Sequence, residues 1–191
     1  MLTLPPIVYI CLEAARAAWV VPVPRLLLLD GDVVVFRPLR LLWQDFDAFG
    51  GASVGTVDDT SVPFADFYEA SLPAHIRGVK GGVQLHDLER QRTGGYLATL
   101  DYIASGKAGL WIPLYGDGTL FSLLKASFSE HSYSLGCEWN RQLMGIRAAF
   151  AKNKSIQSCP RRCAILHANS KVCGTPHANG QPTLPSHPAL P

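Results

Sequence analysis

The chain has 191 residues, of which 48% are hydrophobic and 17% charged, with a formal net charge of +2. A chain of this length can form one domain with a substantial core, and its low charge excludes a disordered or polar coiled-coil protein. Lysine and arginine form no dense run, so the sequence shows no nucleic-acid-binding surface.

The first third of the chain predicts a helix followed by strands. Residues 7–18 have helical apolar spacing and end before two prolines. Residues 25–29 are a continuous apolar run, typical of a strand covered on both faces in a parallel sheet, and residues 33–36 form a β-branched strand. Helical spacing returns over 39–49 and stops at a Gly-Gly pair, and 52–57 predicts another strand.

Strands and helices continue to alternate in the rest of the chain. After a loop at 58–78, the pattern predicts a strand at 82–86, helices at 87–92, 96–105 and 120–128, and a strand at 163–167. Asp87 is suited to cap the helix that it begins. Residues 174–191 are rich in proline and predict a disordered tail, which leaves one α/β domain over 1–173.

The sequence contains no membrane span or targeting signal that we recognise. The most apolar stretch, 17–29, contains Pro22, Pro24 and Arg25 and is shorter than the roughly 20 apolar residues that a spanning helix needs. The N-terminus lacks the residue order of a signal peptide. We therefore expect the chain as written to be soluble.

Five cysteines, at 11, 137, 159, 163 and 173, leave three interpretations open. Cys159 and Cys163, with Cys173, are zinc-ligand types, although no second tight pair follows. Disulfides formed in a secretory lumen are the second interpretation, and unpaired thiols are the third. The odd number leaves at least one cysteine outside any intrachain disulfide.

The most informative segment is Asp30-Gly31-Asp32, between two apolar strands. Residues i and i+2 of an extended chain point the same way, so Asp30 and Asp32 can face one ion. Ligands of open α/β sheets bind beyond the ends of strands, and two carboxylates suit Mg²⁺ or Mn²⁺ shared with a diphosphate. The alternative is an ordinary turn, because Asp-Gly is common in turns.

This segment, LLLLDGDVVVFRPLRLLW, resembles the metal-binding strand of family 8 glycosyltransferases, which retain anomeric configuration and have the GT-A fold. Four further blocks are similar to family motifs in the same order: residues 81–85, 116–121, 137–143 and 165–169. The Trp-Asn-Arg-Gln-Leu run and the final His-x-Asn most resemble the xyloside α-1,3-xylosyltransferase branch. Together the blocks cover residues 5–176.

The resemblance implies a mixed, mostly parallel α/β sheet with helices on both faces. It also implies that the first nucleotide-binding strand of the family lies before this sequence, as would an N-terminal membrane anchor. We therefore expect a partial GT-A domain, whose full-length relatives are placed in the Golgi or endoplasmic reticulum. Its partners would be a UDP-sugar and a glycan or glycoprotein acceptor, with no nucleic acid.

The implied reaction is transfer of a sugar, xylose by resemblance, from a UDP donor to a glycan hydroxyl. Mn²⁺ or Mg²⁺, held by Asp30, Asp32 and His167, would stabilise the UDP leaving group. At the donor we expect Asp30, Gly82, Asp117 and Lys171, with Asp117 contacting the donor sugar by resemblance and also catalytic. Lys80 is another cation near the phosphates. We expect Trp139, Asn140 and Gln142 to line the acceptor side, because apolar sugar faces stack on indole and amides bind hydroxyls.

Simpler roles stay open for several of these residues. Asp117 precedes an apolar helix and suits an N-cap, Trp139 suits the core, and a histidine at a strand end is commonly polar surface. The sequence also departs from the family at Lys80, where an asparagine is expected, and at Gly118-Thr119, where a Gln-Asp pair is expected.

Because both departures remove polar groups from the donor site, a second hypothesis is a truncated or degenerate relative that binds a glycan or partner without turnover. A third, nucleotidyl transfer, lacks the expected glycine-rich phosphate loop.

Overall fold

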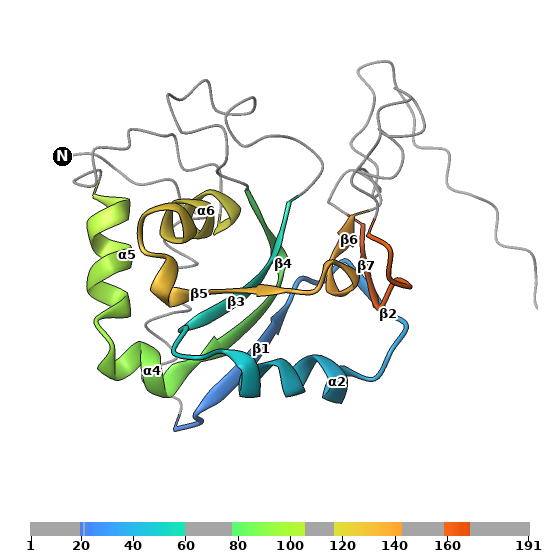
Figure 1. Cartoon of the computed structure of the whole chain (residues 1–191), viewed down its shortest axis with the longest axis horizontal. Helices are drawn as coiled ribbons and strands as arrows, with labels where there is room; N and C mark the ends of the chain where they lie inside the picture. Colours follow the sequence, from blue (N-terminus) through green and yellow to red (C-terminus); the bar gives the residue numbers. More distant parts are fainter. Residues whose placement is uncertain (1–19, 21, 60–77, 106–116, 143–158, 169–191) are drawn as a thin grey trace, which may run out of the picture.

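The computed structural model describes residues 20, 22–59, 78–105, 117–142 and 159–168, shown in colour in Figure 1. Its main sheet has four strands, in the order β1 (Arg25–Leu29), β4 (Val79–Asp87), β3 (Val54–Asp58) and β5 (Ser132–Leu135). A smaller sheet has the order β2 (Val33–Val35), β7 (Ile165–His167) and β6 (Arg141–Gln142). The expected strands are present, and β5 and β6 are additional to the prediction.

The described strands pair in both directions. β4 is antiparallel to β1 and β3, and β2 is antiparallel to β7, whereas β3 with β5 and β6 with β7 are parallel. The mixed α/β class is confirmed, but the expectation of mostly parallel pairing is wrong for these strands. Coverage of β1 on both faces is also wrong, because Leu26 and Leu28 are 36% and 38% exposed. A strand with one face on the core alternates in burial, and the apolar run hid that alternation.

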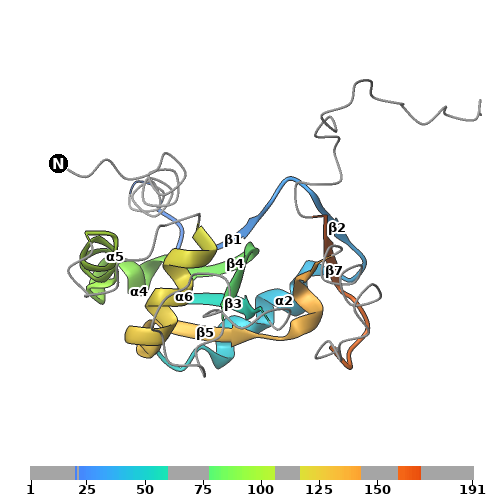
Figure 2. The same cartoon turned by 90° about the horizontal axis from the view of Figure 1, so that it is seen from above.

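Helices cover both faces of the main sheet, as expected. α4 (Leu88–Thr93), α5 (Tyr96–Ala104) and α6 (Asp117–Ser127) lie together, apart from α2 (Leu39–Trp43) and the 3₁₀ turn η1 (Gln44–Ala48) (Figure 2). One apolar cluster joins α5 and α6 to β3 and β4, and the other joins α2 and η1 to β3, β4 and β7. Two further 3₁₀ turns are η2 (Ser129–His131) and η3 (Cys137–Trp139).

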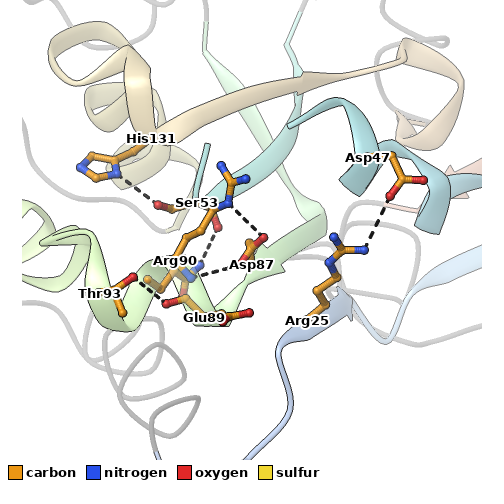
Figure 3. Close-up of polar contacts among 9 residues, drawn as sticks. Arg25, Asp47, Ser53, Asp87, Glu89, Arg90, Thr93 and His131 are labelled. Carbon is orange, nitrogen blue, oxygen red and sulfur yellow. Dashed lines mark hydrogen bonds and ion pairs between the residues drawn. The ribbon is translucent and has the colours of Figure 1, made fainter. Parts of the chain in front are cut away.

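The predicted cap of α4 is confirmed, because the Asp87 carboxylate accepts a hydrogen bond from the Arg90 backbone N–H at 3.0 Å (Figure 3). Three other predictions concern residues outside the described part: the helix at 7–18, the centre of the loop at 58–78 and the tail at 174–191. Among the described helices, none is long and apolar enough to cross a membrane.

A buried histidine on β4 lies on the side of the sheet that α6 covers. The ring of His86 contacts Phe121 edge-on, Nε2 lies 2.8 Å from Gln84 Oε1, and Nδ1 lies 2.9 Å from Gln91 Nε2. Burial lowers the pKa of His86 to about 4.

The lowered pKa of His86 predicts a loss of stability on mild acidification. The unfolded chain protonates this ring below its ordinary pKa of 6.5, whereas the folded chain keeps it neutral down to about 4. The free energy of unfolding should therefore fall by about 3 kcal/mol more in the wild type than in His86→Gln as the pH falls from 6.5 to 4. Urea titrations at several pH values measure this difference in the free energy of unfolding. If the free energy of unfolding fell equally with pH in wild type and His86→Gln, the lowered pKa assigned to His86 would be wrong.

Candidate metal centre

Strand pairing brings Asp32 and His167 together from distant parts of the sequence. Val33 is opposite His167 in the antiparallel pair of β2 with β7, and the Ala168 N–H donates to the Asp32 carbonyl at 2.9 Å. His167 Nε2 consequently lies 3.1 Å from Asp32 Oδ1 and 3.3 Å from Asp30 Oδ2. The two carboxylates and the imidazole predicted from the sequence thus converge on one point.

Asp30 is held by an irregular part of β4. Thr56 pairs with Gln84 and Val57 with Lys80, so residues 81–83 of β4 have no counterpart in the register with β3. The Gly82 carbonyl in this bulge accepts the Asp30 backbone N–H at 3.0 Å. A bulge of this kind redirects a strand locally, and this one lies beside the three converging side chains.

Gly82 lies directly beneath the His167 ring. A Cβ built on Gly82 would overlap the Cε1 and Nδ1 atoms of His167 and would lie 3.0 Å from Asp30 Oδ2. Glycine is therefore required here for close approach, which explains its position in the centre. Gly31, between the two aspartates, is different, because a Cβ there would meet nothing within 4 Å.

Asn140 determines which nitrogen of His167 carries a proton. The Asn140 Nδ2 donates to the Lys80 carbonyl at 3.4 Å, so its Oδ1, 3.2 Å from His167 Nδ1, accepts a hydrogen bond from the Nδ1–H of the ring. His167 Nε2 is then the nitrogen that faces the carboxylates. A lone pair there is the arrangement that a metal ligand needs, and an outer hydrogen bond of this kind fixes it.

A cation would be attracted to all three of these side chains. With Nδ1 donating to Asn140, Nε2 offers a lone pair beside two carboxylate oxygens, so a positive ion placed among them would interact favourably with each. Ligands about 2.1 Å from an octahedral ion stand about 3.0 Å apart at right angles, close to the 3.1 and 3.3 Å that separate Nε2 from the two carboxylates. All three ligand atoms lie within 4.8 Å of one another, which is compatible with one shared ion.

The other residues expected at the site lie in several places. Trp139 and Asn140 are buried, Trp139 in the core cluster beneath Arg37, and Gln142 on β6 is next to His167 in the parallel pair with β7. Burial lowers the pKa of Lys80, and the Asp59 carboxylate 4.0 Å away partly opposes this. Asp117 begins α6, and Lys171 lies outside the described residues.

A disulfide joins Cys137 to Cys159, and among the described cysteines Cys163 is free and half-buried. Cys159 is thus not paired with Cys163 as a zinc ligand, which corrects that interpretation. The bond ties η3, which precedes Asn140, to the segment that leads into β7 and His167. Sequence reasoning predicted disulfides only as a class, since spacing alone does not give connectivity.

A hollow of about 560 Å³ lies elsewhere, between the turn before β3, α4 and η2. Polar groups that line it already have partners: Ser53 Oγ lies 3.2 Å from His131 Nδ1, and Arg90 Nε lies 3.4 Å from Oδ2 of Asp87, which is outside the hollow (Figure 3). None of the residues expected in the site lines it. The converging aspartates and histidine remain the stronger candidate.

No protein-family model and no curated protein sequence matches the chain. Among solved structures, apo mouse xyloside xylosyltransferase 1 is similar with a TM-score of 0.65 and 24% identity, over 88% of this chain and 65% of that one. The galactosyltransferase LgtC with donor and acceptor sugar analogs has a TM-score of 0.61 and 17% identity, over 86% of this chain and 58% of that one. The glycosyltransferase GlyE of Streptococcus pneumoniae has a TM-score of 0.55 and 19% identity, over 84% of this chain and 37% of that one.

These similarities establish the fold. The chain has the GT-A architecture that its motifs predicted, and its structural neighbours are glycosyltransferases of the family 8 type. It spans less than two thirds of the length of each of these three proteins.

The close approach of Gly82 to His167 predicts that alanine destabilises the protein at position 82 but not at position 31. Gly82→Ala must displace the imidazole and should lower the free energy of unfolding by about 1–3 kcal/mol, the usual cost of overpacking. Gly31→Ala, which meets open space, should stay within about 0.5 kcal/mol of wild type. Urea unfolding measures both, and the imidazole resonances of His167 should shift only in Gly82→Ala. Equal responses of the two variants would be inconsistent with the packing described.

Proposed function

We propose that this chain is part of a metal-dependent retaining glycosyltransferase that uses a UDP-sugar donor. The observation that carries the proposal is the convergence of Asp30, Asp32 and His167 at a strand junction. The fold shared with several glycosyltransferases, one of them in complex with donor and acceptor sugar analogs, supports it.

The donor set favours Mn²⁺, with Mg²⁺ as the alternative. Two carboxylates suit either hard cation, while an imidazole nitrogen favours a transition metal. When bound, such an ion supplies Lewis-acid stabilisation of the negative charge that develops on a diphosphate leaving group. The chain's own residues orient the ligands: the β2–β7 pairing sets Asp32 against His167, the Gly82 carbonyl holds Asp30, and Asn140 keeps His167 Nε2 available.

The carboxylates also explain where a donor would approach. The Asp30 side chain is 47% exposed and that of Asp32 is 34% exposed, whereas His167 is buried. A diphosphate would therefore reach the centre from the side of the two aspartates. We further propose roles for Gly82, Asp117 and Lys171 at the donor, with Asp117 also catalytic, and for Trp139, Asn140 and Gln142 on the acceptor side.

Xylose is the donor sugar that we propose, and a glycan or glycoprotein hydroxyl is the acceptor. The Cys137–Cys159 disulfide supports a lumenal location in the Golgi or endoplasmic reticulum, because disulfides persist in oxidising compartments. Donor binding without sugar transfer would instead indicate a non-catalytic relative.

Metal binding is tested by calorimetry on the full chain with MnCl₂ and UDP. We expect the dissociation constant for Mn²⁺ to rise at least about tenfold in Asp32→Asn, because the amide removes a charged ligand. Asp47→Asn is the matched control, since Asp47 is an exposed aspartate paired with Arg25 at 3.8 Å. UDP should bind more tightly with Mn²⁺ than without it. Metal affinity unchanged by Asp32→Asn, or UDP binding independent of Mn²⁺, would refute the metal role.

Sugar transfer is tested by incubating the full chain with UDP-xylose, Mn²⁺ and a xyloside acceptor. We expect slow transfer with retained anomeric configuration, read by NMR of the product, since polar groups expected near the donor are absent at Gly118-Thr119. His167→Gln should reduce the rate at least about tenfold. Manganese-dependent UDP binding without any product would favour the non-catalytic relative, and an inverted product would exclude a retaining enzyme.

A further inference from the structure

A continuous chain of buried side chains connects helix α4 to the bulge beside the candidate metal centre. Gln91 Nε2 lies 2.9 Å from both the Ser53 carbonyl and His86 Nδ1. His86 Nε2 lies 2.8 Å from Gln84 Oε1, and Gln84 Nε2 donates to the Gly81 carbonyl at 2.7 Å. All three side chains are buried, so water does not offer them alternative partners.

The direction of every hydrogen bond in this chain is determined. The Ser53 carbonyl only accepts, so the amide nitrogen of Gln91 must face it, and the same nitrogen donates to His86 Nδ1. With Nδ1 accepting, Nε2 carries the ring proton and donates to Gln84 Oε1, which turns the Gln84 amide nitrogen toward Gly81. One proton arrangement therefore satisfies the whole chain, and its end point is a backbone carbonyl.

That carbonyl belongs to the part of β4 on which the metal centre depends. Residues 81–83 lack the regular pairing with β3 that holds the rest of β4 in register. The next residue, Gly82, accepts the Asp30 N–H through its carbonyl and supports the His167 ring against its Cα. A rotation of the peptide at Gly81 would therefore move one carboxylate ligand and the surface beneath the imidazole together.

We propose that Gln84, His86 and Gln91 are positioning residues for the metal centre, an inference that rests on the proposed function. Residues 81–83 lack regular pairing with β3, and these side chains take over that role by linking the Gly81 carbonyl to Gln91 on α4. Burying three polar side chains is costly unless their hydrogen bonds are made, and the Oε1 atom of Gln91 has no hydrogen-bond partner in the described part of the chain. The network would justify this free-energy cost by fixing the geometry of the bulge. Apolar packing is not directional and would leave that geometry unspecified.

The decisive experiment removes the last link of the chain and compares two backbone amides. In Gln84→Met, which keeps the length of the side chain, we expect hydrogen exchange of the Asp30 amide to accelerate at least about tenfold. The Phe36 amide, bonded to the Ala164 carbonyl at 2.8 Å, reports on the neighbouring strand pair and should keep its exchange rate. Leu100→Ala, in the α5–α6 cluster, serves as a control for general destabilisation.

Metal affinity provides the second readout. The dissociation constant for Mn²⁺ should rise about tenfold in Gln84→Met, the range seen when outer-shell support of a metal ligand is removed, and by less in Leu100→Ala. Gln91→Met, at the far end of the chain, should cause the same two effects in weaker form. It also provides the test if Gln84→Met does not fold.

The outcomes separate this inference from the proposed function. If the wild-type chain binds no Mn²⁺, the proposed function fails, and the Asp30 exchange rate still decides whether the network positions the bulge. If the wild type binds Mn²⁺ and both variants keep its affinity and its Asp30 exchange rate, the positioning role is wrong. Equal acceleration at Asp30 and Phe36 would show a purely global effect and would also overturn it.

Discussion

Val33 and His167 face each other across an antiparallel strand pair, although 133 intervening positions separate them in the sequence. This pairing joins the Asp-Gly-Asp turn near the start of the described chain to the strand near its end. Asp32 is next to Val33, and its carbonyl accepts the N–H of Ala168, so both sides of the contact are held by backbone bonds. The proposed metal centre, the orientation of His167 and the approach of Asp30 all depend on it.

Hydrogen bonding and charge then determine what the strand pair can bind. The Nδ1–H of His167 donates to Asn140 Oδ1, which leaves Nε2 facing the two carboxylates. A positive ion placed among these atoms would be attracted to all of them. The carboxylates are partly exposed and the imidazole is buried, which is the arrangement that the proposed metal ion would need to contact an anionic ligand from solvent.

The surroundings restrain this group from two directions. The disulfide between Cys137 and Cys159 ties the turn before Asn140 to the segment leading into β7. In addition, the amide and imidazole network ends at Gly81, in the part of β4 that lacks regular pairing with β3. Both restraints act on backbone next to the ligands, so ligand geometry depends on residues that would not touch a metal or a donor.

The sequence by itself determined the strands around the site and the paired aspartates. Short apolar runs predicted the strands that flank Asp30 and Asp32 and the strand that ends at His167, and the i, i+2 spacing of the aspartates predicted a shared direction, because these properties are local to each segment. The ligand role of His167 came from the family resemblance. The order of the motifs predicted the GT-A fold, which the structural neighbours confirm. The Asp87 cap was likewise readable, since a cap depends on residues three positions apart.

Only the tertiary structure decided which segments meet. The antiparallel pairing that leaves Leu26 and Leu28 half exposed, the bulge at Gly82, the contact of Asn140 with His167 and the partner of Cys137 all join residues distant in sequence. Strand direction, bulge position and disulfide connectivity arise from packing between whole elements. A local pattern of apolar and polar residues is compatible with several such arrangements, and the burial of side chains between the sheets and helices selects one of them.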